Sequence, residues 1–359
     1  MNLLTTPSSH QHKWISYVLI IFTLSRIINL LAIYFGRIMA HTSDPLLYQL
    51  ATLWDSSFFI QAARTLDFGR AFFPLFPLLV RLISLNGILS IEISAIVLNQ
   101  LFLFLTLYIL ALYLEAKNKV FSVADIKFAL IILAYSPMNI FFLAAYSEAT
   151  FLFLTILALY FLEKDRPYLL AICGMLMGAT RSIGSAMTII LIIHQLKRRK
   201  LSLALLFQVL ISLSGLLLYS LYCQIHHGDF ISYIHDEANW GRTGWIISTI
   251  HRWDYLKYNI DIAFLRDLLA FGLALLLSLV LFWNKFTMEG LLYLFFILPG
   301  FISGSTTYGI FFSSARLDAA VIPFYLALAL IGRNNTYLKT MIIALSVLFL
   351  DQSWVLWTS

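Results

Sequence analysis

Long apolar stretches recur along the whole of this sequence, and only short polar segments separate them. The clearest stretches are Trp14–Tyr34, Glu92–Leu114, Leu201–Tyr222, Ile262–Trp283 and Leu338–Trp357. The pattern predicts an all-α polytopic membrane protein with about 9–11 transmembrane or short re-entrant helices, because an apolar helix of about 20 residues crosses a bilayer. No polar segment is long enough to form a separate soluble domain, so we expect one integral-membrane domain.

The composition and the charge pattern agree with this fold class and indicate which loops are cytoplasmic. Hydrophobic residues make up 61% and charged residues 12% of the chain, whereas soluble domains contain about 25% charged residues. The net charge of +6 does not indicate nucleic-acid binding, because the basic residues form short clusters beside the apolar stretches. Cytoplasmic loops carry such clusters. We therefore place Lys117 and Lys119, Lys164 and Arg166, and Lys197–Lys200 in the cytoplasm.

Counting membrane crossings outward from these clusters assigns the other loops of the single domain, residues 1–359. The extracytoplasmic set includes a first loop at 37–71 and a late loop at 224–261. Residues 125–163 contain two predicted spans, so the turn Tyr146–Glu148 between them lies on the same side. The first loop, the late loop and this turn are therefore predicted to lie on the same face of the membrane.

Two segments are too short to cross as full spans. Residues 167–196 have both ends in the cytoplasm, which leaves about 14 residues for each crossing, and a span needs about 20. The polar break Ala179–Gly184 interrupts the apolar pattern, and we predict two short or re-entrant helices that meet at Arg181. Such backbone is tolerated only where it lines protein or a wet cavity. The segment Phe72–Leu85 must similarly dip in and return, or pair with another short helix.

The same count collects charged residues at the extracytoplasmic face. They are Asp55, Asp67, Arg70, Glu148, Arg181 and Arg316, together with the loop 224–261. Charged groups near membrane depth are costly and tend to face a cavity. We therefore expect a polar site on this face.

Five stretches, in order, resemble signatures of one family. The segment WDSSFFIQAARTLDFGRAFFPLFPLLVRL (Trp54–Leu82) is similar to the signature of the PIG-V family, the second mannosyltransferase of glycosylphosphatidylinositol anchor assembly, and of its bacterial and archaeal relatives. The others are AYSEATFLFLTILALYFLEKDR, AICGMLMGATRSIG, GDFISYIHDEANWGR and SSARLDAAVIPFYLALAL. The resemblance covers roughly residues 15–332. It implies a GT-C glycosyltransferase fold, a lipid-phosphate-linked sugar donor, and an essential acidic residue in the first extracytoplasmic loop.

The sequence departs from the family pattern at three points. Phe58-Phe59 stands where relatives carry a His or aromatic pair, Glu237 replaces a Gln, and Leu317 replaces the Tyr of a late Arg-Tyr pair. These departures leave the sugar and the acceptor open.

The resemblance implies that Asp55 is the general base, since attack by an acceptor hydroxyl requires a nearby proton acceptor. A single displacement that inverts the anomeric centre needs only one carboxylate. Trp54 is expected to hold that carboxylate or to stack on a sugar ring. The residues alone also fit a helix Ser56–Leu66 that has Asp55 as its N-cap.

The other candidates each have a structural alternative. Glu148 is a second acid that positions the acceptor or Asp55, or a first-turn residue favoured by the helix dipole. Guanidinium groups stabilise a leaving phosphate bidentately, which makes Arg181, Arg242 and Arg316 candidates. Arg316 also fits snorkelling to the interface, and Arg242 fits a solvated loop. Trp240 fits sugar stacking or an interfacial aromatic belt.

We expect no cofactor. The loop residues His226, His227, Asp229, His235, Asp236 and Glu237 include the ligand types of a divalent metal, but their spacing matches no ligand pattern and favours a wet loop. The sequence has no Gly-rich phosphate loop, which agrees with a lipid-linked donor.

The sequence therefore predicts a mannosyltransferase-like enzyme of a prokaryotic cytoplasmic membrane, or of the endoplasmic reticulum in a eukaryote. Its site would face away from the cytoplasm and would use a polyprenyl- or dolichyl-phosphate-linked sugar and a lipid, glycan or protein acceptor. Two alternatives stay open. One is a transporter or lipid flippase, because broken helices and intramembrane charges also mark transporters. The other is a non-catalytic GT-C-like subunit.

Overall fold

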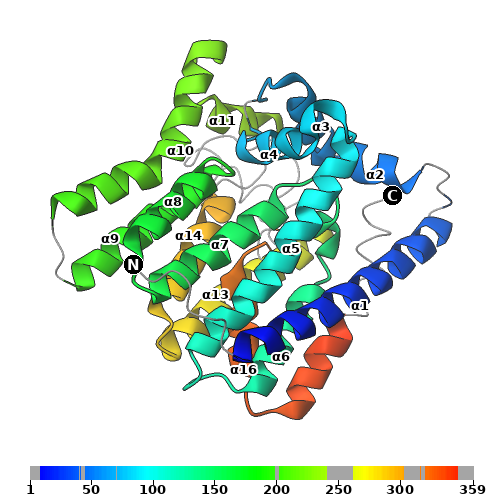
Figure 1. The fold of residues 1–359 in the computed structure, drawn as a ribbon, viewed down its shortest axis with the longest axis vertical. Helices are drawn as coiled ribbons and strands as arrows, with labels where there is room; N and C mark the ends of the chain where they lie inside the picture. The colour runs from blue at the N-terminus through cyan, green and yellow to red at the C-terminus, as the bar shows by residue number, and fades with distance from the viewer. Residues whose placement is uncertain are drawn as a thin grey trace.

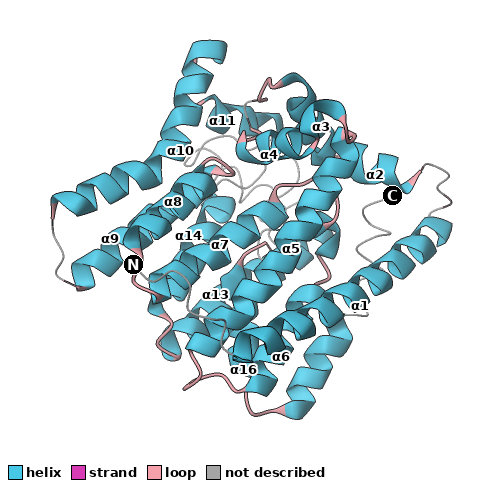
Figure 2. Ribbon diagram, viewed as in Figure 1, coloured by secondary structure: helices cyan, strands magenta, loops and turns pink. Residues whose placement is uncertain are grey.

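The computed structural model describes residues 9–39, 41, 45–69, 71–198, 202–240, 262–302, 316 and 320–346. Within these ranges every regular element is a helix (Figure 2), as the apolar pattern predicts. The labelled α-helices are α1 (Ser9–Met39), α2 (Leu46–Thr52), α3 (Asp55–Thr65), α4 (Leu75–Ile83), α5 (Ile91–Ala116), α6 (Val123–Ala134), α7 (Glu148–Glu163), α8 (Pro167–Gly178), α9 (Ala186–Lys197), α10 (Leu203–His227), α11 (Ser232–His235), α13 (Ile262–Trp283), α14 (Thr287–Ile302) and α16 (Ile322–Gly332). Residues 336–346 are also helical. Short 3₁₀ turns are η1 (Leu85–Gly87), η2 (Asn139–Phe142), η3 (Ser182–Ser185) and η4 (Asp236–Trp240).

Three helices of the described chain are long and apolar enough to cross a membrane. They lie at Lys13–Ile38 within α1, at Ile91–Ala116 (α5) and at Leu203–His227 (α10). On α1 and α10 many large apolar side chains are exposed. Since a bilayer solvates such side chains, this exposure agrees with lipid-facing helices.

The segment at residues 167–196 folds as two short helices, as predicted. Helices α8 and α9 have 12 residues each, about 18 Å at 1.5 Å per residue. The break between them contains Arg181 and η3. The segment Phe72–Leu85 contains another short helix, α4, which packs against α3 and α5.

Neither of the two spans predicted in residues 125–163 is among the helices long enough to cross a membrane: α7 has 16 residues, and the first span is interrupted. Helix α6 ends at Ala134 and is followed by irregular backbone and η2 until α7 begins at Glu148. Pro137 explains the early end, because it lacks an amide donor and disfavours helical backbone at Ser136. Irregular backbone therefore leads directly into the turn Tyr146–Glu148.

Close helix contact holds the α8–α9 pair against α10. A Cβ added to Gly215 of α10 would lie 1.9 Å from the Met175 carbonyl oxygen of α8, and one added to Gly174 would lie 2.1 Å from Ser212 Oγ. Small residues allow such approach between membrane helices, where packing replaces the hydrophobic effect as the driving force. Packing against α10 thus stabilises α8 and α9, which are too short to span a bilayer by themselves.

Polar contacts at one end of the bundle join the loops that carry the basic clusters. Lys117 contacts Glu163 at 2.7 Å, and Arg198 pairs with Asp165. Helices α2, α3, α4 and α11 gather at the opposite end, at the top of Figure 1. The arrangement confirms that these loops share one end, and it leaves the opposite end for the candidate site.

Candidate active site

Asp55 is the first residue of α3, not the residue before it. The helix begins at Asp55, and Trp54 occupies the N-cap position. Trp54 has φ 53° and ψ −133°, a conformation that costs a bulky L-residue about 1–3 kcal/mol. The N-cap interpretation of Asp55 is therefore wrong by one residue. Its carboxylate is paired with Arg316 instead.

Glu148 is the first residue of α7, as the helix-dipole alternative expects. Its side chain is fully buried, with 0% of its surface exposed. Burying an ionised carboxylate is very costly unless charge and hydrogen bonds compensate it. Two guanidinium groups supply that compensation.

Arg181 lies in the break after α8, with extended backbone at φ −156° and ψ 143°. The neighbouring Leu75 N–H donates to the Ala179 carbonyl at 3.0 Å, which ties the start of α4 to this break. A Cβ on Gly184 would lie 2.3 Å from the backbone of Met177. The turn thus packs tightly on the end of α8, and this packing fixes the place from which Arg181 extends.

The four side chains form one connected set, called the ion-pair cluster below. Arg316 Nη1 lies 2.8 Å from Asp55 Oδ2, and Arg316 Nη2 lies 2.6 Å from Glu148 Oε1. Arg181 Nη2 lies 2.7 Å from the same Glu148 oxygen. Two carboxylates and two guanidiniums make the cluster neutral. Convergence of these charges at one end of the bundle, as the crossing count predicts, is confirmed.

Exposure increases across the cluster from Glu148 to Asp55. The exposed fraction of the side chain is 0% for Glu148, 19% for Arg316 and 26% for Asp55. Burial disfavours the charge of Arg316, but Glu148 and Asp55 outweigh it and raise the pKa of Arg316 above its ordinary value. Arg316 therefore stays charged, and Asp55 is the more accessible of its two carboxylate partners.

Aromatic side chains surround Arg316 and α3. The guanidinium carbon of Arg316 lies 4.6 Å from the Tyr146 ring centroid and 4.8 Å from that of Phe141, which adds cation–π attraction. Phe72 stacks on Phe58 of α3 at 4.7 Å between ring centroids. The segment that begins at Phe72 thus packs against the helix that begins with Asp55.

A family model described as Mannosyltransferase (PIG-V) matches residues 17–252. The match covers well over half of the chain and includes Asp55, Glu148 and Arg181. The chain belongs to the PIG-V mannosyltransferase family. The same comparisons gave no match among curated proteins and none among solved structures. Membership indicates a membrane glycosyltransferase of the mannosyltransferase type, and the all-helical, span-containing fold agrees with it.

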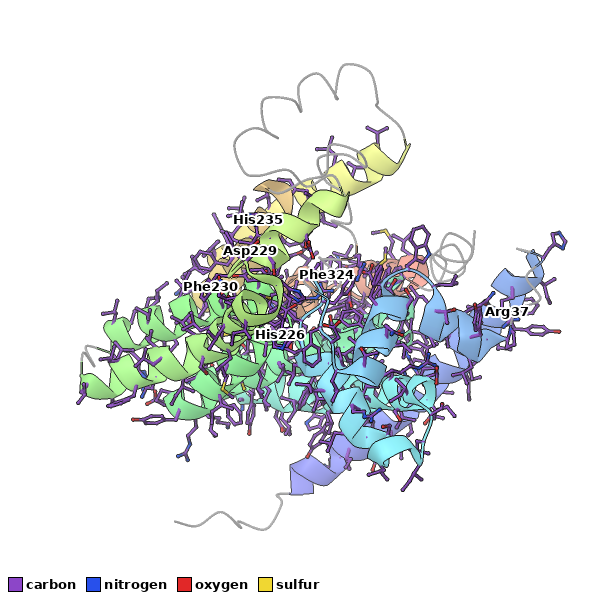
Figure 3. The ribbon with its side chains drawn as sticks, turned by 90° about the horizontal axis from the view of Figure 1, so that it is seen from above. Arg37, His226, Asp229, Phe230, His235 and Phe324 are labelled. Carbon is purple, nitrogen blue, oxygen red and sulfur yellow. The ribbon has the colours of Figure 1, made fainter. Side chains whose placement is uncertain are left out.

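The remaining residues predicted for this PIG-V family member lie outside the ion-pair cluster or outside the described chain. Trp240 is the last residue of η4, and Arg242 lies outside the described residues. His235 Nδ1 contacts Asp229 Oδ2 at 2.6 Å, beyond the end of α10 (Figure 3). Among the described residues, no three His, Cys, Asp or Glu side chains gather as a metal site.

Sequence reasoning missed the polar side chains that hold the irregular segment before α7. Arg26 of α1 donates to Gln100 Oε1 at 3.1 Å and to Asn139 Oδ1 at 3.0 Å. Asn99 of α5 donates to the carbonyls of Ala144 and Tyr146. The signal was present as isolated polar residues inside apolar stretches, which usually have a partner at membrane depth.

Proposed function

We propose that this chain transfers a mannosyl-type sugar from a polyprenyl-phosphate-linked donor to a hydroxyl of an extracytoplasmic lipid, glycan or protein acceptor, with inversion. The observation that carries the proposal is the bridge that Arg316 forms between Asp55 and Glu148. In this bridge the partly exposed carboxylate of Asp55 lies beside the Arg316 guanidinium, which also contacts the buried Glu148. A base and a phosphate-binding group are thus adjacent.

The proposed reaction is a single displacement. The acceptor oxygen attacks the anomeric carbon, and the bond from that carbon to the phosphate oxygen breaks. The bonding pair leaves with the polyprenyl phosphate, and Asp55 takes the proton of the acceptor hydroxyl. The products are the inverted glycoside, the lipid phosphate and a protonated Asp55, so no covalent intermediate on the protein is required.

Arg316 would couple the two charge changes of this step. Before reaction its Nη1 pairs with Asp55 at 2.8 Å. When Asp55 takes the proton it loses its charge, while the leaving phosphate gains one. The same guanidinium can then shift its strongest contact from carboxylate to phosphate, because its fork suits both groups. Transition-state charge is stabilised in this way without a change in net charge around Arg316.

The contacts favour a holding role for Glu148 and phosphate contact for the arginines. Glu148 Oε1 accepts from both Arg181 and Arg316, and its burial keeps it away from an acceptor. Trp54 is 65% exposed and offers a ring for stacking on the sugar. Contacts of Trp240 and Arg242 with the donor stay predictions from the resemblance.

The test is an in vitro transfer assay with a panel of labelled polyprenyl-phosphate sugars, comparing wild type with Asp55→Asn. We expect Asp55→Asn to lower transfer by about 10²–10⁴-fold, since it removes the base, while expression and membrane insertion are kept. Asp67→Asn is the matched control, because Asp67 lies in the same predicted loop and contacts Tyr222 of α10. An active, well-inserted Asp55→Asn variant would refute the role of Asp55. Product with the donor's anomeric configuration would refute inversion.

A further inference from the structure

We propose that Asn99 of α5 is a positioning residue that fixes the turn before Glu148 and, through Tyr146, the geometry of Asp55 and Arg316. The inference rests on the proposed function, which uses the Asp55–Arg316 pair. Asn99 does not touch the pair, so its effect must pass through the turn.

Asn99 is a fully buried amide within a long apolar helix. Its Nδ2 donates to the Ala144 carbonyl and, at 3.1 Å, to the Tyr146 carbonyl. A buried amide costs several kcal/mol in an apolar medium unless it is hydrogen-bonded. Both of its amide hydrogens are therefore committed to the same three-residue stretch, which makes the contact specific.

The turn Ala144–Tyr146 lies between η2 and α7 and belongs to neither helix. All three residues are buried, and buried irregular backbone needs hydrogen-bond partners from other elements. Ala145 N–H donates to the Leu50 carbonyl of α2 at 3.0 Å, so α2 holds the donor side of the turn. Asn99 holds the carbonyl oxygens of the turn, those of Ala144 and Tyr146. Gln100, the next residue of α5, donates to the Phe142 carbonyl at 3.1 Å, earlier in the segment and further from Glu148.

Tyr146 connects this turn to the reacting groups. Its hydroxyl accepts from the Asp55 N–H at 3.3 Å, and its ring lies 4.6 Å from the Arg316 guanidinium carbon. Ser147, the next residue, accepts from Arg181 Nε at 3.3 Å. A shift of the turn would therefore move three groups together: the Tyr146 hydroxyl that contacts the start of α3, the Tyr146 ring that packs on Arg316, and the Ser147 hydroxyl that contacts Arg181. Misplacement by about 1 Å can lower a rate 10²-fold.

The experiment measures kcat, KM for the donor and segment mobility in Asn99→Ala. We expect kcat to fall about 30–100-fold, with KM changed less than about threefold, and amide exchange of the peptide containing residues 144–147 to rise. Thr106→Val is the control, because Thr106 is buried on the same helix and its hydroxyl donates within α5, to the Phe102 carbonyl. Asn99→Gln keeps the amide donors and should recover part of kcat.

A double-mutant cycle with Tyr146→Phe tests the route. If Asn99 acts through Tyr146, the double variant should lose less than the product of the two single losses, because contacting groups are not additive. Multiplicative losses, or an Asn99→Ala variant with wild-type kcat and wild-type exchange at 144–147, would overturn the proposal. Equal exchange changes in Thr106→Val would also overturn it.

Failure of the proposed function would look different. An active Asp55→Asn enzyme would refute the proposed role of Asp55 as the base. The amide-exchange measurement on residues 144–147 would still test whether Asn99 holds the turn. If Asn99→Ala does not give a monodisperse protein, Asn99→Leu, which also removes the amide donors but fills the space, carries the exchange and kcat measurements. Wild-type values in that variant together with additive behaviour in its cycle with Tyr146→Phe would reject the positioning role.

Discussion

Replacing Glu148 by Gln is the perturbation that separates the two carboxylates of the ion-pair cluster most sharply. Glu148 is fully buried and receives N–H donors from Arg181 and Arg316 on one oxygen. Gln keeps an acceptor of nearly the same shape but removes the negative charge. Asp55 is then the one carboxylate left in the cluster for two guanidiniums, and it contacts Arg316, so Arg181 loses its charged partner in the cluster and a buried site acquires an uncompensated positive charge.

The expected cost follows from these contacts. Breaking a buried ion pair by removing one partner costs about 3–5 kcal/mol. Since the Gln oxygen still accepts hydrogen bonds, we expect a loss of about 2–4 kcal/mol in the free energy of unfolding for Glu148→Gln. Asp55 pairs with Arg316, and 26% of its side chain is exposed. A partly solvated pair contributes about 1 kcal/mol or less, so Asp55→Asn should unfold nearly like wild type.

The assay is thermal unfolding in detergent, followed by transfer activity of the folded fraction. Glu163→Gln is the control, because Glu163 ends the same helix and pairs with Lys117 at the opposite end of the bundle, with 35% of its side chain exposed. The order of stability should be Glu148→Gln well below Glu163→Gln and Asp55→Asn. A Glu148→Gln protein as stable as wild type, or an Asp55→Asn protein less stable than Glu148→Gln, would refute this account of the cluster.

Two further predictions concern charge geometry and helix contact. Arg316→Lys keeps the charge but loses the fork that reaches Asp55 and Glu148 together, so kcat should fall about 10²–10³-fold; a drop below threefold would show that charge alone suffices. Gly215→Ala places a Cβ 1.9 Å from Met175 oxygen and should destabilise the protein by about 1–3 kcal/mol in thermal unfolding. Gly272→Ala, where an added Cβ meets nothing within 4 Å, should leave the melting temperature unchanged or raise it slightly.

The sequence allowed the class of fold and part of the site to be predicted. Apolar length and the polar break at Ala179–Gly184 predict α8 and α9 because the periodicity of a helix and the thickness of a bilayer are general constraints. The crossing count also brings Asp55, Glu148 and Arg181 to one end. These predictions require only the side of the membrane on which each residue lies, and the basic clusters indicate that side.

The partners within that end could not be predicted in the same way. Asp55 and Glu148 each begin a helix, but which of them a given arginine contacts depends on how α3, α7 and the residue Arg316 pack in three dimensions. The early end of α6 was predictable in principle, since Pro137 is visible in the sequence. The irregular segment that follows α6, and its contact with Asn99, could not be predicted. The carbonyls that this segment leaves without a helical partner are known only from the fold.

The shortness of α8 and α9 has a consequence for how this protein is made. A helix of 12 residues reaches only about 18 Å into a hydrocarbon core about 30 Å thick. The membrane insertion machinery therefore has no independent span to release at Arg181. We expect this pair to enter as a hairpin and to be held there by contact with α10, whose Gly215 follows later in the chain. Since α10 and Arg316 both follow later in the chain, we expect the contact between Arg181 and Glu148 to become stable only after α10 has been synthesised, and Arg316 to complete the ion-pair cluster last.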